Sequence, residues 1–316
     1  MRSVQILACA IAVSISMISC KKDMIEMENT WPHHIASNGA LANLIAQHAP
    51  PIQQFVIDAS VGATVTGVRG CKITFRPNAF VDQGNNLVNG SVTVYLQEVL
   101  NKTDIIYSGG YTTANGLPLV SGGEINIKAT QGVNELRLAG PNAAIASIPV
   151  TGDPVPMKKF TAREISMGSD FSMADTFSLA MFLDTSSFVG TQLYYGLGLD
   201  SLDWTNCDQY MSMPNPTRFS VSVPVIFDNQ NTMVFVTSDF SNYVSRIWDY
   251  DAVVHVYNCN YYRLPVGEQF TFTAISEING QFYYASRTVT ITEDIAVSLV
   301  PQVCTEAEVL QNISNL

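Results

Sequence analysis

Between residues 70 and 129, apolar and polar side chains alternate with a period of two. Such alternation predicts antiparallel β-strands that turn one face to a core and the other to water. The apolar positions are Cys71, Ile73 and Phe75, then Val92, Val94 and Leu96, then Ile125, Ile127 and Ala129. Turn residues such as Asn89-Gly90 separate the runs, and Pro77 ends a strand because it has no N–H to donate.

The same pattern returns after residue 193. Short alternating runs cover residues 219–227, 233–236, 253–257, 270–274, 282–284, 289–291 and 295–299. Asn279-Gly280 is the strongest hairpin signal in the chain, because both residues accept the positive φ that a two-residue turn requires. At least six short strands at this spacing predict a second β-sandwich over residues 193–303.

Two segments flank this second predicted sandwich. Residues 151–192 form a connecting segment, with a strand expected over 157–165 and a loop over 167–175. At the other end, Thr305 and Glu308 have the spacing of a capping box, which predicts a helical tail over residues 304–316.

Several spaced motifs carry a resemblance to a known family. They are I-x-F-x-P-N-A-F at 73–80, G-x-V-x-V-x-L-x-E-V at 90–99, K-x-D-I-I at 102–106 and L-x-S-G-G-x-I-x-I-x-A at 119–129. This region resembles the ZU5-like modules of Bacteroidota envelope lipoproteins. The resemblance covers roughly residues 52–140 and implies a β-sandwich, which we place at 52–150. A further motif, W-x-N-C-D-x-aromatic at 204–210, resembles a signature that follows the first module in these lipoproteins. The expected fold is therefore mainly β, with two antiparallel β-sandwich domains.

The N-terminus has the pattern of an exported lipoprotein. Arg2 precedes an apolar stretch over residues 4–18 that is too short to span a bilayer comfortably. We interpret residues 1–19 as a signal peptide and Cys20 as the lipidated residue, with a plain secretory signal as the alternative. Residues 20–51 are expected to be a tether with a short helix, which Pro50-Pro51 ends. Lipoproteins with Lys at the position of Lys21 pass to an outer membrane, so we expect the protein there.

Composition narrows the classes of partner. The chain has 316 residues, a formal net charge of −11 and only 14% charged residues. An acidic chain repels polyanions, which argues against nucleic-acid binding. The expected partners are the membrane, through the lipid, and an envelope protein or a glycan.

Four cysteines remain beyond the lipidation site. Cys71 lies on the apolar side of its run and is expected to be a buried free thiol. Cys207 and Cys259 are the candidate disulfide pair, since an exported compartment permits such bonds. Because C-x-x-C and C-x-x-H spacings are missing, neither a metal nor another cofactor is expected.

No catalytic motif is present, so the leading function is non-catalytic. His255 is expected on an apolar strand, and Ser121-Gly122-Gly123 in a tight turn. Acids near Trp204 (Asp200, Asp203 and Asp208) and beside Tyr250 (Asp249 and Asp251) are carboxylate groupings that could serve hydrolysis, and loop acids can also hold calcium.

Aromatic residues near predicted loops suggest the other function class. Trp204, Trp248 and Tyr250 are candidate ligand contacts, because exposed rings stack on sugars or dock proteins. The alternative is that they fill the ends of the sandwich. Three functions thus remain: a structural or protein-interaction module, a carbohydrate-binding surface lipoprotein, and a hydrolase that uses loop carboxylates.

Overall fold

The protein is mainly β, as the sequence predicts, and all strand pairs of the described residues are antiparallel except one. The computed structural model describes residues 39–108, 112–114, 117–151, 155–162, 172–173, 182–183, 193–258 and 263–316. The predicted signal peptide and Cys20 lie outside these residues. Within the described residues, no helix has the length and apolar character needed to cross a bilayer.

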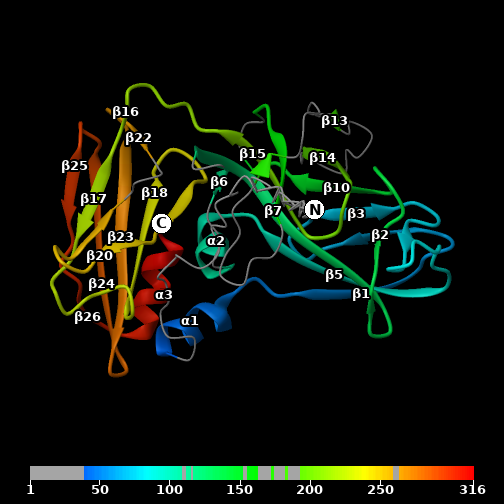
Figure 1. Cartoon of the computed structure of the whole chain (residues 1–316), viewed down its shortest axis with the longest axis horizontal. Coiled ribbons are helices and arrows are strands. Elements are labelled where there is room, and N and C mark those ends of the chain that lie inside the picture. The colour runs from blue at the N-terminus through cyan, green and yellow to red at the C-terminus, as the bar shows by residue number, and fades with distance from the viewer. Residues whose placement is uncertain are drawn as a thin grey trace, which may run out of the picture. The chain divides into compact units, whose positions relative to one another are not determined.

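Two sheets pack face to face to form the N-terminal sheet pair (Figure 1). The larger sheet has the order β1 (Gln53–Asp58), β5 (Ser91–Val99), β7 (Leu117–Gln131), β15 (Trp204–Tyr210), β11 (Lys158–Ala162) and β12 (Ser172–Met173), and β6 (Thr113–Ala114) and β8 (Asn134–Glu135) also pair with β7. The other has the order β13 (Phe182–Leu183), β14 (Tyr194–Leu199), β10 (Ala144–Pro149), β3 (Lys72–Phe75) and β2 (Ala63–Thr66). β4 (Phe80–Val81) pairs with β9 (Arg137–Leu138) at the side. All nine predicted inward positions between Cys71 and Ala129 are buried in the shared core.

The remaining strands form the C-terminal sheet pair. One sheet has the order β19 (Val244–Ile247), β18 (Thr232–Ser238), β23 (Gln269–Ile278), β24 (Gln281–Thr290) and β26 (Gln302–Cys304). The other has the order β20 (Asp249–Asp251), β21 (Val256–Asn258), β17 (Phe219–Ser222) and β25 (Ile295–Ser298), with β16 (Pro216–Thr217) and β22 (Leu264–Pro265) paired separately. The hairpin between β23 and β24 is confirmed, since Asn279 and Gly280 have φ of 52° and 82°.

Three helices cover the free face of the β18–β23 sheet: α1 (Ala40–His48), α2 (Lys102–Ser108) and α3 (Glu306–Ser314) (Figure 1). On β18, Val234 points to the core between the sheets, and its neighbour Phe235 points to the helices, as strand alternation requires. The predicted capping box is confirmed, because Thr305 and Glu308 exchange hydrogen bonds at the start of α3. α1 was expected within a tether, but its Leu41 and Leu44 are buried among the helices. Residues 40–48 are therefore part of the folded core.

The structure corrects the boundary between the predicted sandwiches. β14 and β15 were assigned to the second sandwich, which was placed at residues 193–303, yet they pair with β10 and β7 of the N-terminal sheet pair. The alternation predicted over 219–227 also ends early, at Ser222, and Val225 is exposed. Pro224 explains the early end, because it cannot donate to a strand ladder. The number of independent domains stays a prediction.

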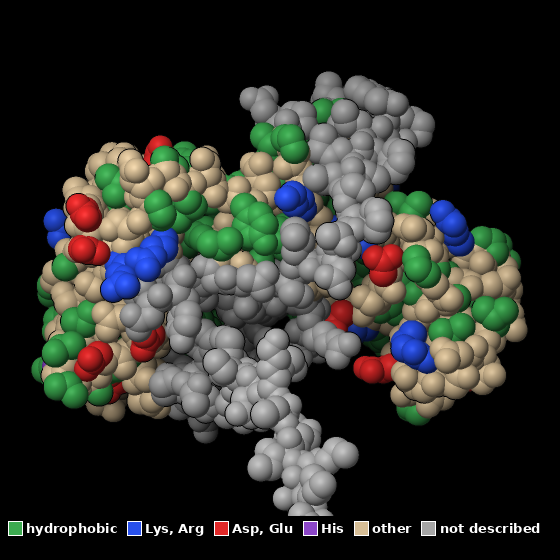
Figure 2. Space-filling view, turned by 45° about the horizontal axis from the view of Figure 1, so that its top comes forward, with side chains coloured by type: hydrophobic (Ala, Val, Ile, Leu, Met, Phe, Trp, Pro, Cys, Tyr) green, Lys and Arg blue, Asp and Glu red, His purple; other side chains and the backbone are tan. Residues whose placement is uncertain are grey.

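The surface reflects the low content of charge. Figure 2 shows few acidic and basic side chains among many uncharged polar and apolar ones on the face in view. Isolated apolar residues such as Val133 and Val253 are strongly exposed, at 96% and 88%. Both lie in or beside turns, and scattered exposed residues of this kind are normal in a folded protein.

Candidate functional site: the polar cluster between β7 and β15

Two of the sequence motifs meet across one strand pair. The S-G-G motif lies in the middle of β7, and the N-C-D motif lies in β15. Asn206 pairs with Glu124 and Asp208 pairs with Ser121, so two residues of β7 stand opposite the single residue Cys207. The motif expected to form a tight turn is therefore a β-bulge within a continuous strand.

The bulge explains why both residues after Ser121 are glycines. Gly123 has φ of 127°, a conformation that other residues rarely adopt. A Cβ at Gly122 would lie 2.8 Å from the carbonyl oxygen of Cys207, and one at Gly123 would lie 2.8 Å from Cγ2 of Ile148. Side chains at this point would push the two strands and the core apart.

The bulge also gathers four polar side chains, which we call the polar cluster: Ser121, Glu124, Asn206 and Asp208. Residues 121 and 124 would face opposite sides of a regular strand, but the extra residue turns both toward Asn206. The Ser121 hydroxyl donates to Oδ1 of Asn206 at 3.3 Å. From Nδ2, Asn206 donates to Oδ2 of Asp208 at 2.5 Å and to Oε1 of Glu124 at 3.4 Å.

Both acids of the cluster are removed from water. Glu124 and Asp208 are 0% exposed. Burial raises the pKa of Asp208 well above its usual range, against the hydrogen bonds from Ser121, Gly122 and Asn206. Burial, followed by the nearby charge of Asp208, does the same to the pKa of Glu124. The cluster thus gathers hydrogen-bond acceptor oxygens at a site from which water is excluded.

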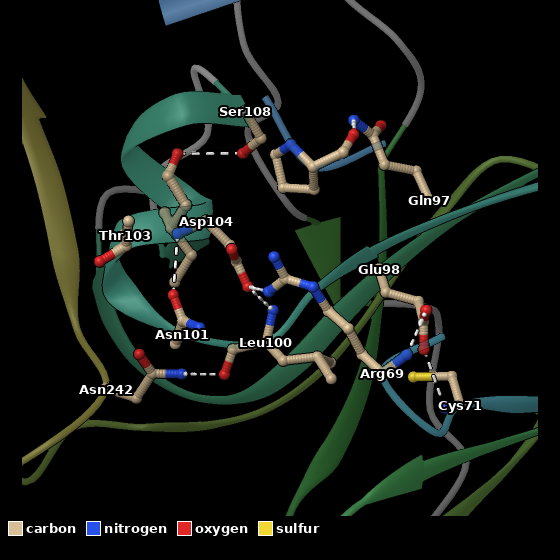
Figure 3. Close-up of polar contacts among 12 residues, drawn as sticks. Arg69, Cys71, Gln97, Glu98, Leu100, Asn101, Thr103, Asp104, Ser108 and Asn242 are labelled. Atoms are coloured by element: carbon tan, nitrogen blue, oxygen red, sulfur yellow. Dashed lines mark hydrogen bonds and ion pairs between the residues drawn. The ribbon is translucent and has the colours of Figure 1, made fainter. Parts of the chain in front are cut away.

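A second buried acid holds the loop before β3 (Figure 3). Glu98 accepts hydrogen bonds from the backbone N–H groups of Arg69 and Cys71, at 3.0 and 2.9 Å, and from Nε2 of Gln53 at 2.8 Å. These donors satisfy both carboxylate oxygens. Glu98 therefore acts as a structural anchor for residues 67–71.

The start of α2 is tied to the same loop (Figure 3). Asp104 forms an ion pair with Arg69 and accepts the N–H of Leu100 at 3.0 Å. Asn101 caps the helix by accepting the N–H of Asp104 at 2.9 Å. The K-x-D-I-I motif thus orders the chain where it leaves the N-terminal sheet pair.

Asn242 connects the two sheet pairs. Its Nδ2 donates to the backbone carbonyl oxygens of Leu100 and Ser121, both at 3.2 Å. The backbone carbonyl of Asn242 accepts the N–H of Ser121 at 2.9 Å. Three hydrogen bonds also join Thr112 and Val244. The carbonyl of Val244 accepts the N–H of Thr112 at 2.8 Å and the Thr112 hydroxyl at 3.0 Å, and the N–H of Val244 is 3.0 Å from that hydroxyl. The polar cluster therefore lies next to a hydrogen-bonded contact between the two sheet pairs.

The predicted disulfide is not formed at Cys207, which is a free, buried thiol. Its strand belongs to the N-terminal sheet pair, and its side chain packs in that core. Cys259 lies outside the described residues. Cys71 is a buried free thiol, as predicted, and burial raises the pKa of both Cys71 and Cys207.

The acids that the sequence grouped around Trp204 each have a different partner, and Asp249 and Asp251 lie two positions apart on β20. Asp208 enters the polar cluster, whereas Asp200 forms an ion pair with Lys159. Asp203 caps the N–H of Trp204 at 2.9 Å, and Asp251 caps the N–H of Val253 at 2.8 Å. Each of these three exposed or half-buried acids already has a local partner.

His255 is not on a strand. It lies in the turn before β21 with φ of 55°, and its Nδ1 is 2.9 Å from the Tyr250 hydroxyl. The three residues before it, from Ala252 to Val254, are exposed and belong to the same turn. The strand predicted over 253–257 therefore begins only at Val256.

The three candidate ligand-contact aromatics are half-buried and packed within the fold. Trp204 lies on β15 and packs against the hydrophobic cluster beneath the three helices and against the small cluster of Ala114, Leu119 and Phe160. Trp248 carries the Arg246 guanidinium over its ring, 3.6 Å from the centroid. Tyr250 packs against Tyr257 in a tilted arrangement, with the ring centroids 4.8 Å apart. The structure brings Tyr250 to His255 and places Trp204 in the other sheet pair.

A polar pocket of ≈ 470 Å³ lies beside α3. Its lining is Lys102, Thr237, Asp239, Thr271, Tyr284, Ser286, Thr288, Asn312, Asn315 and Leu316. Thr271 donates to Oδ1 of Asp239 at 2.8 Å and shares a 2.7 Å hydrogen bond with Thr288. Burial lowers the pKa of Lys102, whose ammonium donates to the carbonyl of Ser238. Hydroxyls, an acid and a cation thus line one hollow.

Sequence reasoning missed Glu98, Glu124 and Asn206 as members of buried networks. For Glu98 a signal was present, because it continues the inward series of Val92, Val94 and Leu96. A charged residue at an inward position indicates a buried polar contact. Glu124 and Asn206 carried no such signal, since the bulge that joins them is not visible in the alternation.

Comparison with known protein families finds no match, and a search of curated proteins finds no relative.

Proposed function

We propose that the protein is a non-catalytic, lipid-anchored module of a bacterial envelope that binds a partner protein. The lipobox-like end at Cys20 supports the anchor. The resemblance to ZU5-like envelope lipoproteins supports an outer-membrane location. Replacing Cys20 by Ala is then expected to release the protein from membranes, and retention of that variant in the membrane fraction would contradict the anchor.

The observation that carries partner binding is the open edge of β24. β24 pairs with β23 along its whole length, but β26 pairs only with Phe282, Tyr283 and Tyr284. Among the described residues, no strand pairs with the outer side of residues 285–290. Ser286, Arg287 and Thr288 are exposed there. An open edge offers backbone N–H and C=O groups to an extended segment of another protein.

Site-specific cross-linking tests this function directly. A photo-cross-linking amino acid replaces Arg287 in the protein expressed in its own organism, and envelopes are irradiated. The control carries the cross-linker at Val133, which is 96% exposed in the N-terminal sheet pair. We expect one discrete adduct with a second protein at 287 only. No adduct, the same adducts at both positions, or an adduct that contains only this chain would contradict partner binding.

Glycan binding is the second candidate, and the polar pocket beside α3 favours it. Hydroxyls, amides and a charged pair next to the half-buried Tyr284 offer the mixed hydrogen bonds that sugars take. On a glycan array, the Asp239→Asn variant should lose any binding of the wild type. Thr290→Val, on β24 beside the pocket-lining residues Ser286 and Thr288 but outside the lining itself, is the control. A wild type that binds no glycan, or a variant that binds equally well, would count against this candidate.

A further inference from the structure

Within the part of the chain that the structure describes, three buried oxygens around the polar cluster have no hydrogen-bond partner. They are Oε2 of Glu124, Oδ1 of Asp208 and Oδ1 of Asn126. Asn126 is two residues beyond Glu124 on β7, so its side chain leaves the same face of the strand. Leaving buried acceptors unpaired is costly, and folded proteins rarely tolerate several of them together. We propose that this site binds a divalent cation, and that its ligand chemistry suits Ca²⁺.

The hydrogen-bond donors of the polar cluster already have acceptors. Asn206 gives its amide N–H groups to both acids, and the Ser121 hydroxyl faces Asn206 and Asp208. The N–H of Gly123 goes to the Ser121 hydroxyl at 3.1 Å. The three buried side-chain atoms that lack a partner are all acceptor oxygens. A metal ion satisfies such a set, because it interacts with lone pairs and brings no acceptor of its own.

The chain supplies no opposite charge to the two acids within the described residues. Lys158 lies opposite Asp208 on β11, but its ammonium is placed over the Tyr210 ring, 5.8 Å from the centroid. Two carboxylates match the charge of one divalent ion. Carboxylate, amide and hydroxyl oxygens are ligands that Ca²⁺ accepts in irregular geometry, with water completing the shell.

The donor set argues against a transition metal. Among the described residues, no group of three His, Cys, Asp or Glu side chains could hold a metal. The nearby thiol of Cys207 packs in the core between the sheets, on the opposite face of β15 from Asn206. Only oxygen ligands are left, which favours a hard ion.

Terbium luminescence gives a direct readout, because Tb³⁺ replaces Ca²⁺ and is excited by a nearby indole. Trp204 is the register partner of Asn126 across β7 and β15. We expect the full-length protein, purified in detergent, to sensitise Tb³⁺ emission, and Ca²⁺ to abolish that emission by competition. Trp204→Phe should lose the emission but keep the stabilisation by Ca²⁺. A saturating excess of Ca²⁺ should raise the Tm by roughly 5 °C.

Variants locate the ion. Glu124→Gln and Asp208→Asn keep the shape of each side chain and remove its charge, so both should lose the emission and the Tm rise. Asp251→Asn removes an acid from a distant turn and should retain both. Emission that persists in the two cluster variants would indicate surface binding and overturn the proposal. Stronger competition by Mg²⁺ than by Ca²⁺ would overturn the choice of ion.

The other physical solution is a proton held between the acids. An acid whose pKa is raised by folding binds more protons in the folded state, so stability falls as pH rises through that pKa. A protein with no sensitised emission, no response to Ca²⁺ and this pH dependence, lost in Glu124→Gln, would overturn the cation site.

Discussion

The carboxylate of Glu98 accepts the backbone N–H of Cys71 at 2.9 Å, across a sequence separation of 27 residues. Glu98 sits on β5 at a position whose neighbours on the same face are core residues. A buried acid is tolerated there because it replaces water for several donors at once. The loop that begins β3 is thus fixed by a charge inside the core.

Removing this carboxylate should be costly. Glu98→Ala leaves two backbone N–H groups and the Gln53 amide without their acceptor, so we expect a loss of about 3 kcal/mol or more in unfolding free energy. Urea denaturation measures the loss. Glu98→Gln keeps one acceptor and should lose less, and Glu135→Ala, at an exposed position, should change little. Equal losses in all three would refute the anchoring role.

The β7 bulge should reject any side chain at Gly123. Gly123→Ala combines a φ of 127° with a contact of 2.8 Å to Ile148, so we expect a loss of about 2–4 kcal/mol. Two controls separate the causes. Gly132→Ala has positive φ but open space, and Gly140→Ala has open space and an ordinary φ. The loss, measured by thermal unfolding, should decrease in that order, and a different order would show that the bulge tolerates a Cβ.

Alternation in the sequence correctly placed Cys71, Val94 and Ile127 in the core, because strand side chains reveal their face by a local period. The turn at Asn279-Gly280 and the helix cap at Thr305 could also be predicted from the sequence, since turns and caps depend on residues within a few positions. The strand that pairs with β15 could not be predicted. Its pairing with β7 joins residues about eighty positions apart, and periodicity says nothing about which strands meet.

The sequence pattern did not predict the polar cluster, for a related reason. The bulge shifts the register between Asn206 and Asp208, and it brings Ser121 and Glu124 to one face. A period-two reading holds only while the register is continuous, so it assigned the glycines to a turn. The acid at Glu98 was visible as a charge in an inward series, and only its donors were unknown.

Alkylation of Cys304 should depend on the charge of Glu308. Burial, followed by that charge, raises the pKa of the thiol, so less reactive thiolate is present at neutral pH. Glu308→Gln should move the pH profile of iodoacetamide modification to lower pH and speed the reaction at pH 8. Peptide mapping follows Cys304, and the buried Cys71 and Cys207 should stay unmodified in the folded protein. Thr305→Ala disturbs the helix cap but keeps the charge, so a profile shifted equally in that variant would contradict the electrostatic cause.

Docking of α1 makes the strongest contrast with the sequence-based expectation. A tether tolerates substitution, whereas a packed helix does not, and Leu44 is 2% exposed among residues of α2, α3 and β18. We therefore expect Leu44→Ala to lose about 2–5 kcal/mol of unfolding free energy, because it leaves a cavity in the helix-side core. Gln47→Ala, on the exposed side of the same helix, should stay within about 0.5 kcal/mol of the wild type. Urea denaturation of both variants decides the question. If both leave stability unchanged, α1 belongs to the tether after all; if only Leu44→Ala unfolds early, the folded core begins at α1.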